Sequence, residues 1–325
     1  MDCALRWVVY REYRDSGIKN RKTAVTGNKM RMGNLSLIDC FTRVAEETAA
    51  VFRMSRDFVA INHAKALLTQ HWDNLIKTAP EGKGQPVLVI PGFGANDSMT
   101  EPLRAFLDHK GFHAYGWDCG TNFGPKETIL RGLKDRLDEI YEKHGMKVHC
   151  VGHSLGGYMA REMSREFPAQ TGLTVTLGTP FAAAGSKEST SATLRAAFEM
   201  LNGGGPQTRK ENALLLRAAT LPPAPTTSIY TRKDGFVDPV ACFNPKSAKG
   251  ENIEIDASHC GLVAHPLSAL IVADRLSQGS AWKKFNPKRY EGFALQVRED
   301  QLHLGYKLPR NVKADDDRGL RLFPA

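Results

Sequence analysis

Long apolar runs are missing from this chain, which excludes one whole class of protein. Its uninterrupted apolar stretches are only a few residues long, as in Val87–Ile90, whereas a membrane-spanning helix needs about 20 such residues. The first ten residues hold an arginine within their apolar stretch and lead into further charge, so they do not resemble a secretory signal. We therefore expect a cytoplasmic protein without a membrane span.

Paired cysteines and internal repeats are also lacking. Six cysteines are scattered over 325 residues and form no C-x-x-C pair, which argues against a zinc ribbon or a redox motif. Free thiols in a reducing compartment fit this pattern best, with a disulfide between Cys242 and Cys260 left open. Hydrophobic residues make up 42% and charged residues 24% of the chain, which is ordinary for a globular protein with a substantial core.

The positive net charge of +9 is confined to the two ends of the chain. Residues 1–33 carry a net +5 and residues 283–325 a net +4, whereas residues 34–282 hold 26 charges of each sign. We interpret residues 1–33 as a disordered basic extension and residues 281–325 as a basic tail. Contact of these flanks with an anionic membrane surface is the alternative. The basic residues form no aromatic-interleaved stripe, so we do not expect a nucleic-acid partner.

The remaining residues fall into two parts. Residues 34–84 show apolar side chains at helical spacing and are predicted to form an N-terminal helical segment that ends at a proline- and glycine-rich linker. Residues 85–280 alternate between strand and helix patterns, which predicts an α/β fold with a doubly wound, mainly parallel sheet. Residues 181–225 break this rhythm and are interpreted as a helical cap insertion. Strands are expected at 87–90, 113–117, 147–151, 174–177, 227–231 and 252–255, and helices at 99–110, 126–144, 158–167 and 267–276.

The most informative segment is Val148–Gly157. An apolar strand pattern meets the pentapeptide Gly152-His153-Ser154-Leu155-Gly156, and a helix pattern follows at once. That order is typical of a nucleophile elbow, a sharp strand-to-helix turn that raises one serine hydroxyl above the sheet. Glycine is favoured on both sides of the serine because the turn is tight and the backbones pass close to each other. Ser154 is therefore the candidate nucleophile.

A serine nucleophile needs a base, and the base needs an acid to orient it. Asp234 directly follows a predicted strand, and His259 follows the next one, so both side chains are expected at the same sheet edge as Ser154. Asp238 is the alternative acid. His153 and His265 are the alternative bases, although His265 precedes a proline and a helix start.

The carbonyl oxygen that a serine attacks becomes an oxyanion, which needs hydrogen-bond donors. One candidate donor is the backbone N–H of Leu155, which follows the nucleophile. The other is the backbone N–H of Phe93, in the glycine-rich loop Pro91–Gly94 after the strand at 87–90. A further block, Gly116–Pro125, resembles a loop that some bacterial lipase-like hydrolases place beside the active site. This resemblance implies that Asn122 or Asp118 shapes the pocket there, and simple capping of the loop is the alternative.

Together these segments resemble the α/β-hydrolase superfamily, in particular its lipase and esterase branch, over residues 85–278. The resemblance implies Ser154 as nucleophile, His259 as general base and acid, and Asp234 as its partner. It also implies Phe93 and Leu155 as oxyanion donors, a small acyl ester as substrate, and neither a metal nor an organic cofactor. An acyltransferase or thioesterase with the same triad is the alternative, followed by a catalytically silent binding protein. The sequence does not determine the oligomeric state.

Overall fold

The computed structural model describes residues 59–183, 219–303 and 320–321. The chain divides into two units, Met1–Ala49 and Ala50–Ala325, and all the described residues belong to the second. The predicted extension at 1–33, the first part of the helical segment at 34–84 and most of the cap insertion at 181–225 therefore lie outside the described residues. Within the described part of the helical segment, residues 59–70 are helical and are followed by α3 (Trp72–Thr78).

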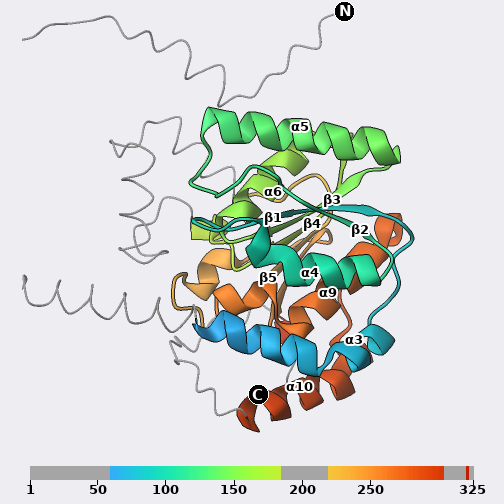
Figure 1. The fold of residues 1–325 in the computed structure, drawn as a ribbon, viewed down its shortest axis with the longest axis vertical. Helices are drawn as coiled ribbons and strands as arrows, with labels where there is room; N and C mark the ends of the chain where they lie inside the picture. The colour runs from blue at the N-terminus through green and yellow to red at the C-terminus, as the bar shows by residue number, and fades with distance from the viewer. Residues whose placement is uncertain (1–58, 184–218, 304–319, 322–325) are drawn as a thin grey trace, which may run out of the picture. The chain divides into compact units, whose positions relative to one another are not determined.

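A single parallel sheet organises the described residues (Figure 1). Its strands lie in the order β2-β1-β3-β4-β5-β6-β7, and every neighbouring pair is parallel. Because parallel strands present their carboxyl ends at one edge, the loops after β1, β3, β4, β5 and β6 meet there. The strands are β1 (Pro86–Ile90), β2 (His113–Gly116), β3 (Val148–His153), β4 (Thr171–Leu177), β5 (Thr226–Tyr230), β6 (Gly250–Glu254) and β7 (Leu320–Arg321).

Helices cover both faces of the sheet, as Figure 1 shows with α5 and α6 above it and α4 and α9 below it. The doubly wound parallel sheet predicted from the alternating sequence pattern is therefore confirmed, and each predicted strand and helix of the core lies within a few residues of an observed one. The helices are α4 (Asp97–His109), α5 (Glu127–His144), α6 (Leu155–Glu166), α9 (Pro266–Ser277) and α10 (Glu291–His303). None of the described helices has the length and apolarity to cross a membrane.

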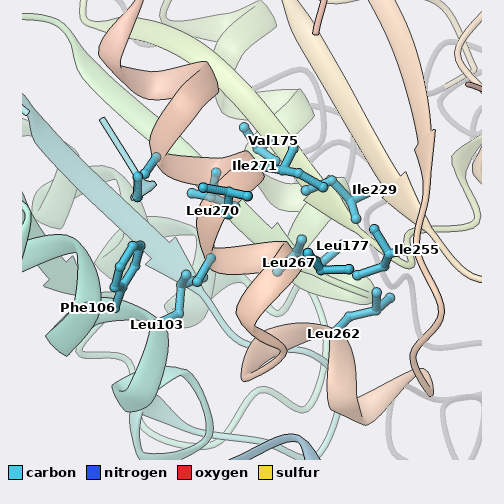
Figure 2. Packing of buried hydrophobic residues seen from close by; sticks show 14 of the residues in the cluster. Leu103, Phe106, Val175, Leu177, Ile229, Ile255, Leu262, Leu267, Leu270 and Ile271 are labelled. Carbon is cyan, nitrogen blue, oxygen red and sulfur yellow. The ribbon is translucent and has the colours of Figure 1, made fainter. Parts of the chain in front are cut away.

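The larger part of the core lies between the sheet and the helices α4 and α9. Figure 2 shows two leucines and Ile271 of α9 beside apolar side chains of the strands and of α4. Every residue of α9 from Pro266 to Leu276 is buried, because α3, α4 and α10 also contact this helix. A helix that is enclosed on all sides must be apolar around most of its circumference, and the sequence LSALIVA meets that requirement.

The interpretation of residues 281–325 as a tail is wrong for its first half. Residues 291–303 form α10, and Tyr290, Phe293, Ala294 and Val297 are buried in the same core as α9. Net charge alone does not predict this packing, because the charged Lys283 and Lys284 are exposed while the apolar side chains between the charges are buried. Further along, β7 adds a seventh strand beside β6.

The structure decides whether Cys242 and Cys260 form a disulfide, which their sequence pattern leaves open. Cys150, Cys242 and Cys260 are buried and Cys119 is half-buried, and no disulfide joins Cys242 to Cys260. Burial raises the pKa of the Cys150 thiol to about 12, so this group stays protonated and unreactive near neutral pH. Among the described residues, the cysteines are therefore part of the packing.

A buried arginine contacts both ends of the segment at 181–225, which the sequence predicts to be a helical cap. Arg161 of α6 is fully buried, and its guanidinium lies 3.6 Å from the ring centroid of Phe181, at the segment's start. It also donates to the carbonyl oxygen of Thr220, at the segment's end, at 2.7 Å and to Oδ1 of Asn244 at 2.8 Å. The first turn after β4 and the chain before β5 are thus attached to the helix that follows Ser154.

Replacing this arginine tests how much the attachment contributes to stability. We expect Arg161→Met to lower the free energy of unfolding by about 1–3 kcal/mol, since the buried Asn244 oxygen loses its charged donor. Urea unfolding measures the change. Arg136→Met is the matched control, because the Arg136 guanidinium pairs with the exposed Glu139 and should contribute less than about 1 kcal/mol. Equal losses in the two variants would contradict the assigned role of Arg161.

Candidate active site

Ser154 lies in a strained turn between β3 and α6. Its backbone has φ 51° and ψ −119°, which makes it one of two described non-glycine residues with positive φ. Such a conformation costs on the order of 1–3 kcal/mol and persists only where the surrounding structure imposes it. Here the glycines permit the turn, because a Cβ on Gly152 would overlap the backbone of Gly156, and one on Gly156 would overlap the carbonyl groups of Ile90 and Pro91. The elbow geometry predicted for this pentapeptide is therefore present.

Asp234 and His259 form a buried pair. The Asp234 Oδ2 atom lies 2.6 Å from Nδ1 of His259, and the two residues are 6% and 3% exposed. The other carboxylate oxygen, Oδ1, accepts the backbone N–H groups of Phe236 and Val237, each at 2.8 Å. These two bonds fix the orientation of the carboxylate, so that its remaining oxygen faces the imidazole. Phe236 also packs its ring 5.1 Å from that of His259.

The end of β4 lies between Ser154 and His259 and is in contact with both. The Ser154 N–H donates to the carbonyl oxygen of Leu177 at 2.8 Å. A Cβ on the next residue, Gly178, would lie 3.0 Å from Nδ1 of His259. Gly178 also has φ +60°, so glycine is favoured at this position both by backbone conformation and by the closeness of the imidazole.

His153, the residue before the serine, also contacts His259 and so links the turn at Ser154 to the loop of His259 a second time. Its Nε2 atom lies 3.0 Å from the backbone carbonyl oxygen of His259, and the two rings are 4.8 Å apart. Its Nδ1 atom faces Gly92, where a Cβ would approach it to 2.8 Å. From its sequence position His153 is only an alternative base, since no sequence pattern reveals a contact over 106 positions. In the structure it lies between the loop of His259 and the loop after β1.

The loop after β1 lies directly against the serine. A Cβ on Gly92 would come within 3.2 Å of the Ser154 Cβ, so the backbone of residues 91–93 passes beside the nucleophile candidate. Phe93 is half-buried and packs edge-on against Phe123. Leu155 is the first residue of α6, and the first N–H groups of a helix have no acceptor within it. Both predicted oxyanion donors thus belong to segments that adjoin Ser154.

The alternative residues occupy other positions. Asp238 is exposed, and its carboxylate accepts the N–H of Val240 at the start of the short 3-10 helix Pro239–Cys242. His265 caps α9 by accepting the N–H of Leu267 at 3.2 Å, as its place before Pro266 suggests. Of the alternatives considered for the acid, only Asp234 contacts His259 through its side chain.

Burial keeps three histidines of this fold neutral. The pKa of His149 is lowered to about 4, and those of His153 and His265 to about 3, in each case chiefly because burial disfavours the charged ring. An unfolded histidine takes up a proton near pH 6.5. The unfolded chain therefore binds more protons than the folded chain between this pH and the lowered values, and stability must fall as the pH drops below 6.5.

This linkage predicts a steep acid dependence of stability. Each of the three histidines should cost about 1.4 kcal/mol per pH unit below 6.5, so the free energy of unfolding measured with urea should be clearly lower at pH 5.5 than at pH 7. His149→Gln, whose amide oxygen can still accept the N–H of Leu173, should reduce the slope by one proton. Equal stability at the two pH values would contradict the assigned neutral state.

A comparison with curated proteins matches part of this chain to part of an esterase. A curated relative, the pimeloyl-[acyl-carrier protein] methyl ester esterase of Shewanella woodyi, is 30% identical over 96 residues, which are 30% of this chain and 36% of the relative. The chain thus matches about a third of that protein's length. No family model matches the chain.

Solved structures with a similar fold include two lipases. The monoacylglycerol lipase of Paleococcus ferrophilus is 16% identical, with a TM-score of 0.46, over 62% of this chain and 96% of that one. A lipase of Bacillus licheniformis is 15% identical, with a TM-score of 0.44, over 61% and 94% of the two chains.

Proposed function

We propose that this protein is a serine hydrolase that cleaves carboxylic esters through an acyl-enzyme intermediate. The observation that carries the proposal is the buried pair of Asp234 and His259, which adjoins a serine in a strained turn through Leu177 and Gly178. A histidine that is oriented by a buried carboxylate and lies next to a serine is the arrangement that activates a hydroxyl for acyl transfer.

The hydrogen bonds determine the direction in which the proton moves. Asp234 as a carboxylate accepts from Nδ1 of His259, so the neutral imidazole carries its proton there and has a lone pair on Nε2. That lone pair takes the hydroxyl proton of Ser154 as its oxygen attacks the ester carbonyl. The imidazolium then gives the proton to the leaving alcohol, and the same nitrogen later activates the water that releases the acid. Asp234 stabilises the imidazolium in both steps.

The oxyanion that forms on the attacked carbonyl is held by the backbone N–H groups of Leu155 and Phe93. The N–H of Leu155 is at the N-terminus of α6, where the helix dipole also favours negative charge. The N–H of Phe93 comes from the loop that passes beside Ser154. Two backbone donors that are fixed before the charge appears cost no reorganisation, and each such donor typically contributes about 10²–10³ to kcat.

An activity panel tests the proposal and its nearest alternatives. Purified protein is assayed with p-nitrophenyl esters of short to long acyl chains and, in parallel, with long-chain acyl thioesters, each with and without an added alcohol as acceptor. Hydrolysis of the oxygen esters as the main activity supports the proposal. A strong preference for thioesters indicates a thioesterase, and product esters formed with the added alcohol indicate an acyltransferase. Inactivity on every substrate would favour a silent binding protein.

A further inference from the structure

The loop after β1 has little rigidity of its own. Phe93, whose N–H is a proposed oxyanion donor, is flanked by Gly92 and Gly94, and Gly94 has φ +72°. Glycines on both sides give a backbone many accessible conformations. An oxyanion donor must nevertheless be fixed before the charge develops, so some other part of the molecule must hold this loop in place.

Asn122 makes three hydrogen bonds to this loop. Its side-chain Nδ2 donates to the carbonyl oxygen of Pro91 at 2.8 Å. Its backbone carbonyl accepts the N–H of Gly94 at 2.8 Å, and its own N–H donates to the carbonyl oxygen of Ala95 at 2.8 Å. Phe93 thus lies between residues that Asn122 holds, with Pro91 before it and Gly94 and Ala95 after it.

Asn122 is itself firmly held. It is completely buried, and its side-chain Oδ1 accepts the N–H of Gly124 at 3.1 Å. The start of the same loop is attached to α4, because the Asp97 carboxylate accepts the N–H groups of Trp117 and Asp118, each at 3.0 Å. Both amide atoms of the Asn122 side chain therefore have backbone partners, and the Nδ2 bond joins two loops that are 31 positions apart.

From this geometry we infer that Asn122 is a positioning residue for the oxyanion hole. Its side chain fixes the carbonyl of Pro91, and through it the direction of the Phe93 N–H, so that the donor faces the attacked carbonyl in advance. The inference rests on the proposed function. It assigns to Asn122 an effect on the transition state rather than on substrate binding, because the oxyanion exists only after attack.

Two variants separate this role from general loop packing. Asn122→Ala removes both side-chain bonds. Asn122→Asp keeps the shape and the acceptor for Gly124 but turns the donor to Pro91 into a repelling carboxylate oxygen. Asn96→Ala is the matched control, because Asn96 is an asparagine between β1 and α4 whose side chain caps α4 by accepting the N–H of Ser98. The control should lower the melting temperature but keep kcat within about twofold of wild type.

The measurements are kcat and KM on a p-nitrophenyl ester, and the inhibition constant of a trifluoromethyl ketone that forms a tetrahedral adduct with the serine. For each Asn122 variant we expect kcat to fall about 10- to 100-fold, less than for complete loss of a donor, with KM within about threefold. The inhibition constant should rise in parallel with the loss of kcat/KM, because the adduct uses the same donors. All assays are run below the melting transition of every variant.

Three results would overturn the inference. One is kcat within threefold of wild type in both Asn122 variants, and a second is an equal loss of kcat in Asn96→Ala. In either case an active wild type and an inactive Ser154→Ala leave the proposed function intact. The third is a wild-type protein that neither hydrolyses esters nor binds the ketone, which removes the proposed function and the inference with it.

Discussion

Ser154→Ala should abolish ester hydrolysis while the protein stays folded. Loss of the nucleophile lowers kcat by a factor on the order of 10⁶ in a serine hydrolase, because the remaining groups cannot form the acyl-enzyme. Alanine keeps the Cβ, so neither the strained backbone nor the contact with Gly92 changes. The hydrogen bonds of residue 154 that involve its N–H and its carbonyl, with Leu177 and Thr179, also remain.

The comparison uses p-nitrophenyl ester hydrolysis by the two purified proteins, with thermal unfolding as the control for folding. Matching melting temperatures and a residual kcat on the order of 10⁶-fold below that of the wild type are expected. A variant that hydrolyses the ester at more than a tenth of the wild-type rate would remove Ser154 from the mechanism. In that case the active site would have to lie outside the turn Gly152–Gly156.

The second large effect is expected for Asp234→Asn, which should lower kcat by about 10⁴. The amide oxygen of the asparagine continues to accept the N–H groups of Phe236 and Val237, so its NH₂ group must face His259. The imidazole then has to accept at Nδ1 and carries its proton on Nε2. A nitrogen that already holds a proton cannot take the proton of Ser154, although the geometry is nearly unchanged.

Asp238→Asn is the matched control for this substitution, because it makes the same chemical change four residues away. Its side chain caps a short helix at the surface, and we expect kcat within about threefold of wild type, as is usual for a surface position away from such a site. Steady-state kinetics on one ester decides between the two carboxylates. A larger loss in Asp238→Asn than in Asp234→Asn would reverse the assignment of the acid.

The sheet could be predicted from the sequence because its signals are local. Apolar stretches such as Val87–Ile90 read as strands, and the elbow has a short motif with the right neighbours on each side. Ser154, Asp234 and His259 each follow a predicted strand, so their side chains are expected at the carboxyl ends of the strands. A parallel sheet brings these ends together at one edge. The geometry of the Asp234 and His259 pair therefore followed from topology.

Contacts between distant loops could not be predicted in the same way. Nothing local to His153 indicates that its ring meets the carbonyl of a residue 106 positions later. The bonds of Asn122 to the loop after β1 are equally remote in sequence, and Arg161 reads as an exposed charge on a helix although it is fully buried. The mistake at residues 281–303 has a similar origin, since net charge describes the exposed side chains and overlooks the apolar residues between them.

The most direct test of the account is to label the protein with a fluorophosphonate, which reacts only with a serine whose hydroxyl is activated. After digestion, mass spectrometry locates the modified residue. The account predicts one adduct, on the peptide that contains Ser154, absent from Ser154→Ala and formed far more slowly in Asp234→Asn. A folded wild-type protein that remains unlabelled, or an adduct on another residue, would contradict it.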